Sequence, residues 1–208
     1  MIRKNYLTDL NKSKKPFIIY KTNKGFDLYT NFSKKIILTN KNIKSFINKT
    51  SKTKFKKRNT DLFIGFFGYE ILNKLIGIQV PKQKSLNFPK GIFYKPEKKI
   101  IFKNKLNYKN KDENYLNSNF NININKKSYK KIFDKFKKKI KSGQTYQIKI
   151  CTKYSNKSKI DPLDFFCRLM KSNMAPESFM IKDKDYSIIS CSPENLITKK
   201  NNFITTKP

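Results

Sequence analysis

The sequence predicts a mixed fold in which antiparallel pairs of strands alternate with amphipathic helices. Short apolar runs flank turn residues, for example on both sides of Thr22-Asn23-Lys24-Gly25, and this arrangement is typical of β-hairpins. Apolar residues recur at helical spacing in residues 128–141, and Pro162 stands where it favours the first turn of another helix. The length of 208 residues allows one large domain or two small ones.

Strand signals are spread along the whole chain. The expected hairpins cover residues 14–38, 91–102, 179–190 and 196–205. Residues 145–154 alternate as one further strand, with Gln147 on its polar face. Gly65 and Gly68 interrupt the apolar run 62–70, which predicts a strand that another backbone approaches closely or that bends into a turn.

Helices are expected over residues 70–78, over 128–141 and from Asp161-Pro162 to the break at Asn173. Ser128 can cap the second of these, and its apolar stripe is expected to pack against a sheet, with a basic helix lying on a membrane as the alternative. The stripe consists of Tyr129, Ile132, Phe133, Phe136 and Ile140, and that of the third helix of Leu163, Phe166, Cys167 and Met170. Residues 41–57 form either one short helix or a solvated connection.

Lysine dominates the charge of the chain. The 48 Lys and Arg residues against 14 Asp and Glu residues give a formal charge of +34, but only Arg3, Arg58 and Arg168 are arginines. Because Lys, Asn, Ile, Phe and Tyr have codons rich in A and T, drift in base composition explains this balance whatever the function. A DNA-binding protein usually keeps Arg for phosphate and guanine contacts. The charge therefore predicts loose anion binding at low salt and is weak evidence for a nucleic-acid function.

Several classes of protein are excluded by composition. The 18 Phe and 11 Tyr residues can build a core, which excludes a disordered tail. The longest apolar stretch, Leu62 to Tyr69, is far shorter than the ~20 residues of a membrane-spanning helix, and no signal peptide is expected. The absence of His and the wide spacing of Cys151, Cys167 and Cys191 argue against a zinc site. Reduced thiols in a cytoplasmic protein are expected.

A shift in composition suggests a boundary within the chain. Residues 104–125 are rich in Asn and Lys and poor in apolar residues, which predicts a linker or surface segment. The predicted organisation is an N-terminal region over residues 1–125 and a second domain over residues 126–208.

Several short motifs follow one another in residues 129–208. They are Ile140-Lys141-Ser142-Gly143-Gln144-Thr145-Tyr146-Gln147-Ile148, Asp161-Pro162-Leu163, Asn173 with Pro176, Ser190-Cys191-Ser192-Pro193-Glu194 and Ile204-Thr205-Thr206-Lys207-Pro208. In order and spacing they resemble the first part of the chorismate-binding domain shared by anthranilate synthase component I, aminodeoxychorismate synthase component I and the isochorismate and salicylate synthases. Residues 16–25 and 62–70 look like the N-terminal region of the component I type. The resemblance implies an α+β fold of antiparallel sheets packed face to face with helices outside, of which this chain holds only a part.

The resemblance also implies roles for individual residues. In this family an amine or water adds to the chorismate ring and a ring hydroxyl leaves, so a carboxylic acid has to protonate the leaving group, a role that maps onto Glu194. Gln147 stands where water-adding members carry a Lys base, and a neutral residue there implies addition of ammonia. Ser192, Thr206 and Lys207 are implied as substrate-binding residues. Without the resemblance, Glu194 is a surface residue beside a Pro turn and Gln147 lies on the wet face of a strand.

A cofactor and partners follow from the same resemblance. Mg²⁺ is implied, with its ligands expected beyond Pro208 and no metal ligand within the chain. The implied partners are chorismate and a glutamine amidotransferase subunit that supplies ammonia, with no specific nucleic acid and no membrane. We expect the chain to be an N-terminal fragment that is inactive and poorly soluble by itself.

Two aminating activities remain open, anthranilate synthesis for tryptophan and aminodeoxychorismate synthesis for folate. The segment that would discriminate them begins at Pro208. Tryptophan-regulated members carry Leu-Leu-Glu-Ser and Asn-Pro-Ser-Pro-Tyr-Met, where this chain has Phe17-Ile18-Ile19-Tyr20-Lys21 and Asn173-Met174-Ala175-Pro176-Glu177-Ser178. These differences favour the aminodeoxychorismate type and predict insensitivity to tryptophan.

Two hypotheses of other classes stand beside the enzyme. One is a basic nucleic-acid-binding protein, which rests on the charge and the aromatic residues alone. The other is a non-catalytic fragment. Salt-dependent binding to an anionic polymer would not separate the first from an enzyme, because both predict it. Turnover of chorismate would.

Overall fold

The computed structural model describes residues 6–52, 60–77, 88–103, 106, 108, 119–158, 160–173, 175–200 and 202–207. The chain divides into two compact units. Unit 1 consists of Met1–Lys109 with Pro162–Pro208, and unit 2 of Asn110–Asp161. The predicted boundary between residues 125 and 126 stays a prediction.

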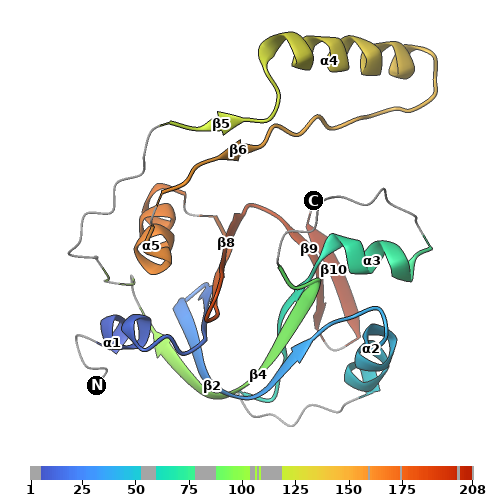
Figure 1. Cartoon of the computed structure of the whole chain (residues 1–208). Helices are drawn as coiled ribbons and strands as arrows, with labels where there is room; N and C mark the ends of the chain where they lie inside the picture. Colours follow the sequence, from blue (N-terminus) through green and yellow to red (C-terminus); the bar gives the residue numbers. More distant parts are fainter. Residues whose placement is uncertain are drawn as a thin grey trace. The chain divides into compact units, whose positions relative to one another are not determined.

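Unit 1 is built on a curled antiparallel sheet of six strands, shown in Figure 1. In spatial order the strands are β3 (Ile64–Phe67), β4 (Gly91–Phe102), β2 (Gly25–Ile37), β1 (Phe17–Thr22), β7 (Glu177–Lys182) and β8 (Ser187–Ser192). β1 therefore joins the N-terminal strands to the β7–β8 hairpin, with Tyr20 opposite Phe179. The hairpins predicted over residues 14–38 and 179–190 are confirmed.

Helices accompany this sheet in unit 1, as in Figure 1, and the predicted α+β class is confirmed. They are α1 (Tyr6–Lys12), α2 (Ile43–Lys52), α3 (Tyr69–Leu75) and α5 (Pro162–Ser172). The helix predicted to begin at Pro162 is therefore present, and residues 41–57 contain one short helix.

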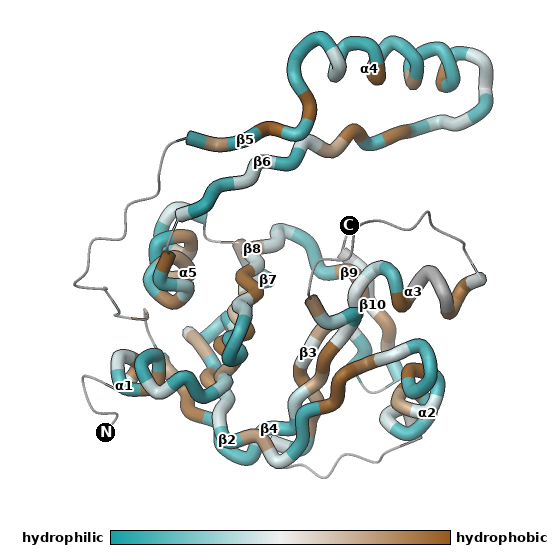
Figure 2. Tube along the Cα trace, viewed as in Figure 1, coloured by the Kyte–Doolittle hydropathy of each residue, from teal (hydrophilic) through white to brown (hydrophobic). Residues whose placement is uncertain are grey.

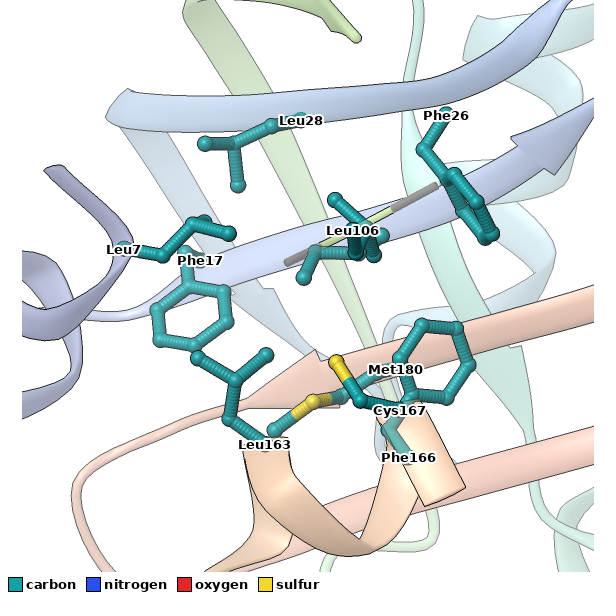
Figure 3. Packing of buried hydrophobic residues seen from close by; sticks show 10 residues of the cluster. Leu7, Phe17, Phe26, Leu28, Leu106, Leu163, Phe166, Cys167 and Met180 are labelled. Carbon is teal, nitrogen blue, oxygen red and sulfur yellow. The ribbon is translucent and has the colours of Figure 1, made fainter. Parts of the chain in front are cut away.

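α5 packs against one face of the sheet through its predicted apolar stripe. Leu163, Phe166 and Cys167 are buried, and Figure 3 shows them gathered with Phe17 and Met180 of the sheet. The ring of Phe166 meets that of Phe26 edge to face, with centroids 6.3 Å apart. Each fully buried side chain of this size stabilises the fold by about 1.5–3 kcal/mol, so α5 is held by its contacts with strands distant in sequence.

Apolar side chains gather in two further clusters. One contains Ile18, Ile92, Tyr94 and Ile181 from β1, β4 and β7. The other contains Leu38, Ile43 and Ile71, which bring α2 and α3 together beside the end of β2. The first cluster packs strands of the sheet together, and the second packs α2 and α3 against the end of β2.

The prediction of a hairpin over residues 91–102 was wrong. The segment is one continuous strand, β4, which pairs with β2 from Ile37↔Ile92 to Phe26↔Phe102. Lys95-Pro96-Glu97-Lys98 resembles a turn locally, but the thirteen-residue partner β2 offers ladder hydrogen bonds along its length. Pro96, which lacks an N–H, lies where the register shifts, close to Asn31 with its left-handed φ of 52°.

Gly65 and Gly68 stand where backbone approaches backbone. A Cβ on Gly65 would lie 1.9 Å from the Ile92 carbonyl oxygen, and one on Gly68 would lie 2.4 Å from that of Lys90. The close approach predicted for this glycine-containing strand is therefore confirmed, and no larger residue fits either position without movement of the backbone.

The C-terminal hairpin of unit 1 pairs β9 (Asn195–Lys200) with β10 (Phe203–Lys207). It confirms the hairpin predicted over residues 196–205. Its apolar side chains lie in solvent: Leu196 is 82 % exposed and Phe203 is 76 % exposed.

Unit 2 contains the helix α4 (Lys126–Lys141) and a short ladder of β5 (Asn121–Ile122) with β6 (Tyr154–Ser155). The cap is Asn125, whose side chain accepts a hydrogen bond from the Ser128 N–H, so the prediction of Ser128 as the cap was wrong. Apolar residues recur along one side of α4, as Figure 2 shows, but no residue of the helix is buried. The expected packing of α4 against a sheet is therefore absent among the described residues.

The strand predicted over residues 145–154 was also wrong, because regular pairing covers only its end at Tyr154. A strand needs a partner for its backbone groups, and in the described part of the chain only β5 provides one. Within the described residues no helix is long and apolar enough to cross a membrane.

Candidate functional site

The Ser192-Pro193-Glu194 turn joins the end of β8 to the beginning of β9. The Ser192 hydroxyl donates a hydrogen bond to the Glu194 carbonyl oxygen (3.0 Å) and accepts one from the Glu194 N–H (3.3 Å). This side chain therefore closes the turn on itself. The Glu194 side chain is exposed, so its carboxylate is available to a ligand and is not desolvated by the described residues.

The last strand lies beside this turn. In the β9–β10 ladder the backbone of Lys207 pairs with Asn195, the neighbour of Glu194, and the register shifts between Thr205 and Lys207. Thr206 lies at that irregularity and is exposed. Irregularities of this kind redirect side chains and are frequent beside active sites. The structure thus brings Ser192, Glu194, Thr206 and the backbone of Lys207 to one end of the hairpin.

A second set of contacts anchors the turn to the large sheet. Glu177 stands opposite Ser192 in the β7–β8 ladder. Its carboxylate accepts a hydrogen bond from the Tyr20 hydroxyl of β1 (2.7 Å) and one from the Asn195 side-chain amide (3.1 Å). Burial and the contact with Glu177 together raise the pKa of Tyr20 to about 12, so this hydroxyl remains a donor at neutral pH.

The two segments that differ from the motifs of tryptophan-regulated family members, at Tyr20-Lys21 and at Glu177-Ser178, are in direct contact. Besides the bond between Tyr20 and Glu177, the Lys21 ammonium donates to the Ala175 carbonyl oxygen (2.8 Å). The buried Ser178 hydroxyl donates to the same carbonyl (2.9 Å). Polar groups of both segments are therefore bonded to one another.

Gln147, the other candidate catalytic residue, lies in unit 2. Its side chain is exposed, and its backbone carbonyl oxygen accepts a hydrogen bond from the Thr145 hydroxyl (3.1 Å). It does not lie on a strand, contrary to the prediction for residues 145–154. Its proposed role in selecting the nucleophile stays a prediction.

A buried polar cluster in unit 1 had no signal in the sequence. Asp183, in the turn between β7 and β8, is bonded to the Lys35 ammonium (2.5 Å) and to the Tyr94 hydroxyl, which lies 3.4 Å from the Tyr186 hydroxyl. Burial alone would raise the pKa of Asp183, but the hydrogen bonds from Lys35 and Tyr94 lower it below 3.8. Burial and Asp183 raise the pKa of Tyr94, and burial raises that of Tyr186 to about 12. Only an alignment or a structure could have joined residues so far apart in the chain.

The described residues contain no group of three or more His, Cys, Asp or Glu side chains that could hold a metal ion. Cys151 is exposed, Cys167 is buried and Cys191 is half-buried, and all three are free thiols.

The chain matches the family described as chorismate binding enzyme over residues 4–208. Among the relatives it resembles is anthranilate synthase component 1 of Saccharolobus solfataricus, 26 % identical over 70 % of this chain and 37 % of that protein. Another is anthranilate synthase component 1 of Buchnera aphidicola (subspecies Rhopalosiphum padi), 28 % identical over 71 % of the chain and 35 % of the relative. Aminodeoxychorismate synthase component 1 of Bacillus subtilis is 29 % identical over 36 % of the chain and 16 % of its own length. The matches with the first two cover little more than a third of those relatives.

Proposed function

The chain belongs to the family of chorismate binding enzymes, and we propose that the protein containing it adds ammonia to chorismate, as component I of an aminodeoxychorismate or anthranilate synthase. The observation that carries the proposal is the family match over residues 4–208. Relatives of both names support it. No finding supports the alternative of a nucleic-acid-binding protein.

Glu194 is proposed as the general acid. Loss of a ring hydroxyl from chorismate requires its protonation, because hydroxide is a poor leaving group, and a carboxylic acid on a fixed turn can supply the proton. The exposed Glu194 side chain lies in the turn that follows β8, and the Ser192 hydroxyl stabilises this turn through hydrogen bonds to the Glu194 backbone. Ser192, Thr206 and Lys207 are proposed to bind the substrate, and the first of these also closes the turn.

Gln147 is proposed to mark the nucleophile as ammonia. A neutral amide cannot act as the base that would activate water, whereas free ammonia is already nucleophilic. Ammonia would come from a glutamine amidotransferase partner in the cytoplasm. The aminodeoxychorismate product is favoured over anthranilate by the residues at Tyr20-Lys21 and Glu177-Ser178.

Mg²⁺ is proposed as a cofactor of the whole protein only. Its ligands are proposed to be residues of the whole protein outside this chain. No role of Glu194 or Gln147 described above depends on the ion.

The experiment is ammonium-dependent turnover of chorismate by the full-length protein with Glu194→Gln. We expect kcat to fall by about 10²–10⁴-fold, the range for removal of an acid–base group. Glu97→Gln is a matched control, because Glu97 is an exposed carboxylate on β4. Normal chorismate consumption by Glu194→Gln would refute the assignment.

A further inference from the structure

The Ser192-Pro193-Glu194 turn is held from two sides. Inside the turn, the Ser192 hydroxyl bonds to the backbone of Glu194. Outside it, the Asn195 amide donates to Glu177 on β7. Backbone pairing also reaches both ends of the turn, because Ser192 stands opposite Glu177 and Asn195 opposite Lys207. The bond from Asn195 to Glu177 adds a side-chain link between the end of the turn and β7.

The Glu177 carboxylate is itself held in place by hydrogen bonds to both of its oxygens. Its two carboxylate oxygens accept from different donors, Tyr20 for Oε2 and Asn195 for Oε1. Charged acceptors make hydrogen bonds about twice as strong as neutral ones. The Asn195 side chain is itself held by a second contact, because its Oδ1 accepts a hydrogen bond from the Thr198 hydroxyl (3.1 Å). A continuous chain of hydrogen bonds therefore runs from β1 through β7 to the first residue of β9.

We propose that Glu177 is a positioning residue, which fixes the orientation of Glu194 through Asn195 and the backbone of the turn. This inference rests on the proposed function, in which Glu194 is the general acid. A misplaced catalytic group lowers the rate of the chemical step even where binding is unchanged.

The first test uses ¹⁵N NMR relaxation of the full-length protein and needs no turnover. In Glu177→Ala and in Asn195→Ala, the backbone order parameter of Glu194 should fall from about 0.85 to below about 0.6, the values of rigid and flexible backbone. Glu177→Gln keeps a carbonyl oxygen for Asn195 and should restore most of the order. Glu97→Ala is the control. Asn195→Ala covers the case in which Glu177→Ala does not fold, because it leaves the bond from Tyr20 to Glu177 in place. Thr198→Ala removes only the bond from Thr198 to Asn195 and controls for the loss of that contact.

Unchanged order at Glu194 in folded Asn195→Ala would overturn the proposal. The second test is turnover by the full-length protein, where Glu177→Ala and Asn195→Ala should lower kcat about tenfold, the loss expected for one hydrogen bond to a charged group, with little change in KM. If Glu194→Gln slows turnover and these variants do not, the positioning role is wrong and the proposed function stands. If Glu194→Gln has no effect, the proposed function is wrong, whatever the relaxation shows.

Discussion

At the scale of single residues, Gln147 makes the most specific chemical prediction. Gln147→Lys should let some water-addition product form, because the neutral form of a lysine amine can act as a base toward water. The measurement is product analysis with chorismate and no ammonia. Lys149→Gln is a matched control, since it changes a lysine two residues away in the same exposed segment. Absence of isochorismate with Gln147→Lys would count against Gln147 as the selector of the nucleophile.

The contacts of Asp183 predict how the stability of the fold depends on pH. Its pKa is lowered in the folded state, so the unfolded chain binds more protons as the pH falls. The stability it contributes is fully present above its ordinary value of 3.8 and is lost as the pH falls through the lower folded value. Asp183→Asn should cost about 1–3 kcal/mol at pH 7, as for a buried hydrogen bond to a charged group, and remove part of the acid sensitivity.

Urea unfolding at neutral and at acidic pH measures both effects for Asp183→Asn. Asp185→Asn is the control, because Asp185 lies in the same turn but is exposed. An equal loss of stability in the two variants would show that the contact with Lys35 and Tyr94 contributes nothing particular.

At the scale of elements, the pairing of β1 with β7 carries the prediction on tryptophan. Tyr20 and Lys21 are bonded to Glu177 and to the Ala175 carbonyl, so a ligand would have to break these contacts to bind between the two segments. Each polar group left unpaired costs about 1–3 kcal/mol, which is roughly tenfold in affinity. The ammonia-dependent rate of the full-length protein should therefore not change with tryptophan up to millimolar concentrations. Inhibition at micromolar tryptophan would contradict this and favour the anthranilate product.

The elements also show what sequence patterns could and could not predict. Hairpins at residues 14–38, 179–190 and 196–205 were predictable because each pairing joins neighbouring runs across a short turn. β4 was not, because its continuity through Pro96 depends on the distant strand β2. The stripe of α4 was read correctly as amphipathic, but its periodicity did not show what would cover it.

The candidate site divides in the same way. Ser192-Pro193-Glu194 was singled out because it stands in order with the other motifs of residues 129–208, which together carry the family resemblance. Its anchor was not predictable, because Tyr20 and Glu177 are 157 residues apart in the chain. The cluster around Asp183 was missed for the same reason, since Tyr94 and Asp183 are 89 residues apart. Local patterns predict a site's motif, whereas contacts across the sheet determine how the motif is held.

At the scale of the whole molecule, charge and exposed apolar surface oppose each other. The chain carries a formal charge of +34, which keeps copies apart at low salt. Leu196 and Phe203 of one hairpin are 82 % and 76 % exposed, and Phe133 of α4 is 46 % exposed. Such surfaces favour association once repulsion is weakened. The Debye length falls from about 10 Å at 0.1 M salt to about 3 Å at 1 M, so salt should decide which effect prevails.

We therefore expect the chain to associate increasingly as NaCl is raised from about 0.1 M to about 1 M, measured by sedimentation velocity. The double variant Leu196→Lys with Phe203→Lys should reduce that association, because it removes apolar surface from the hairpin. Asn202→Lys with Thr205→Lys adds the same charge at exposed polar positions of the hairpin and separates the two causes. If this control suppresses association equally, charge alone governs the behaviour. If association instead falls as salt rises, ionic contacts between copies hold the assemblies together, and the hairpin's apolar surface is not what drives them.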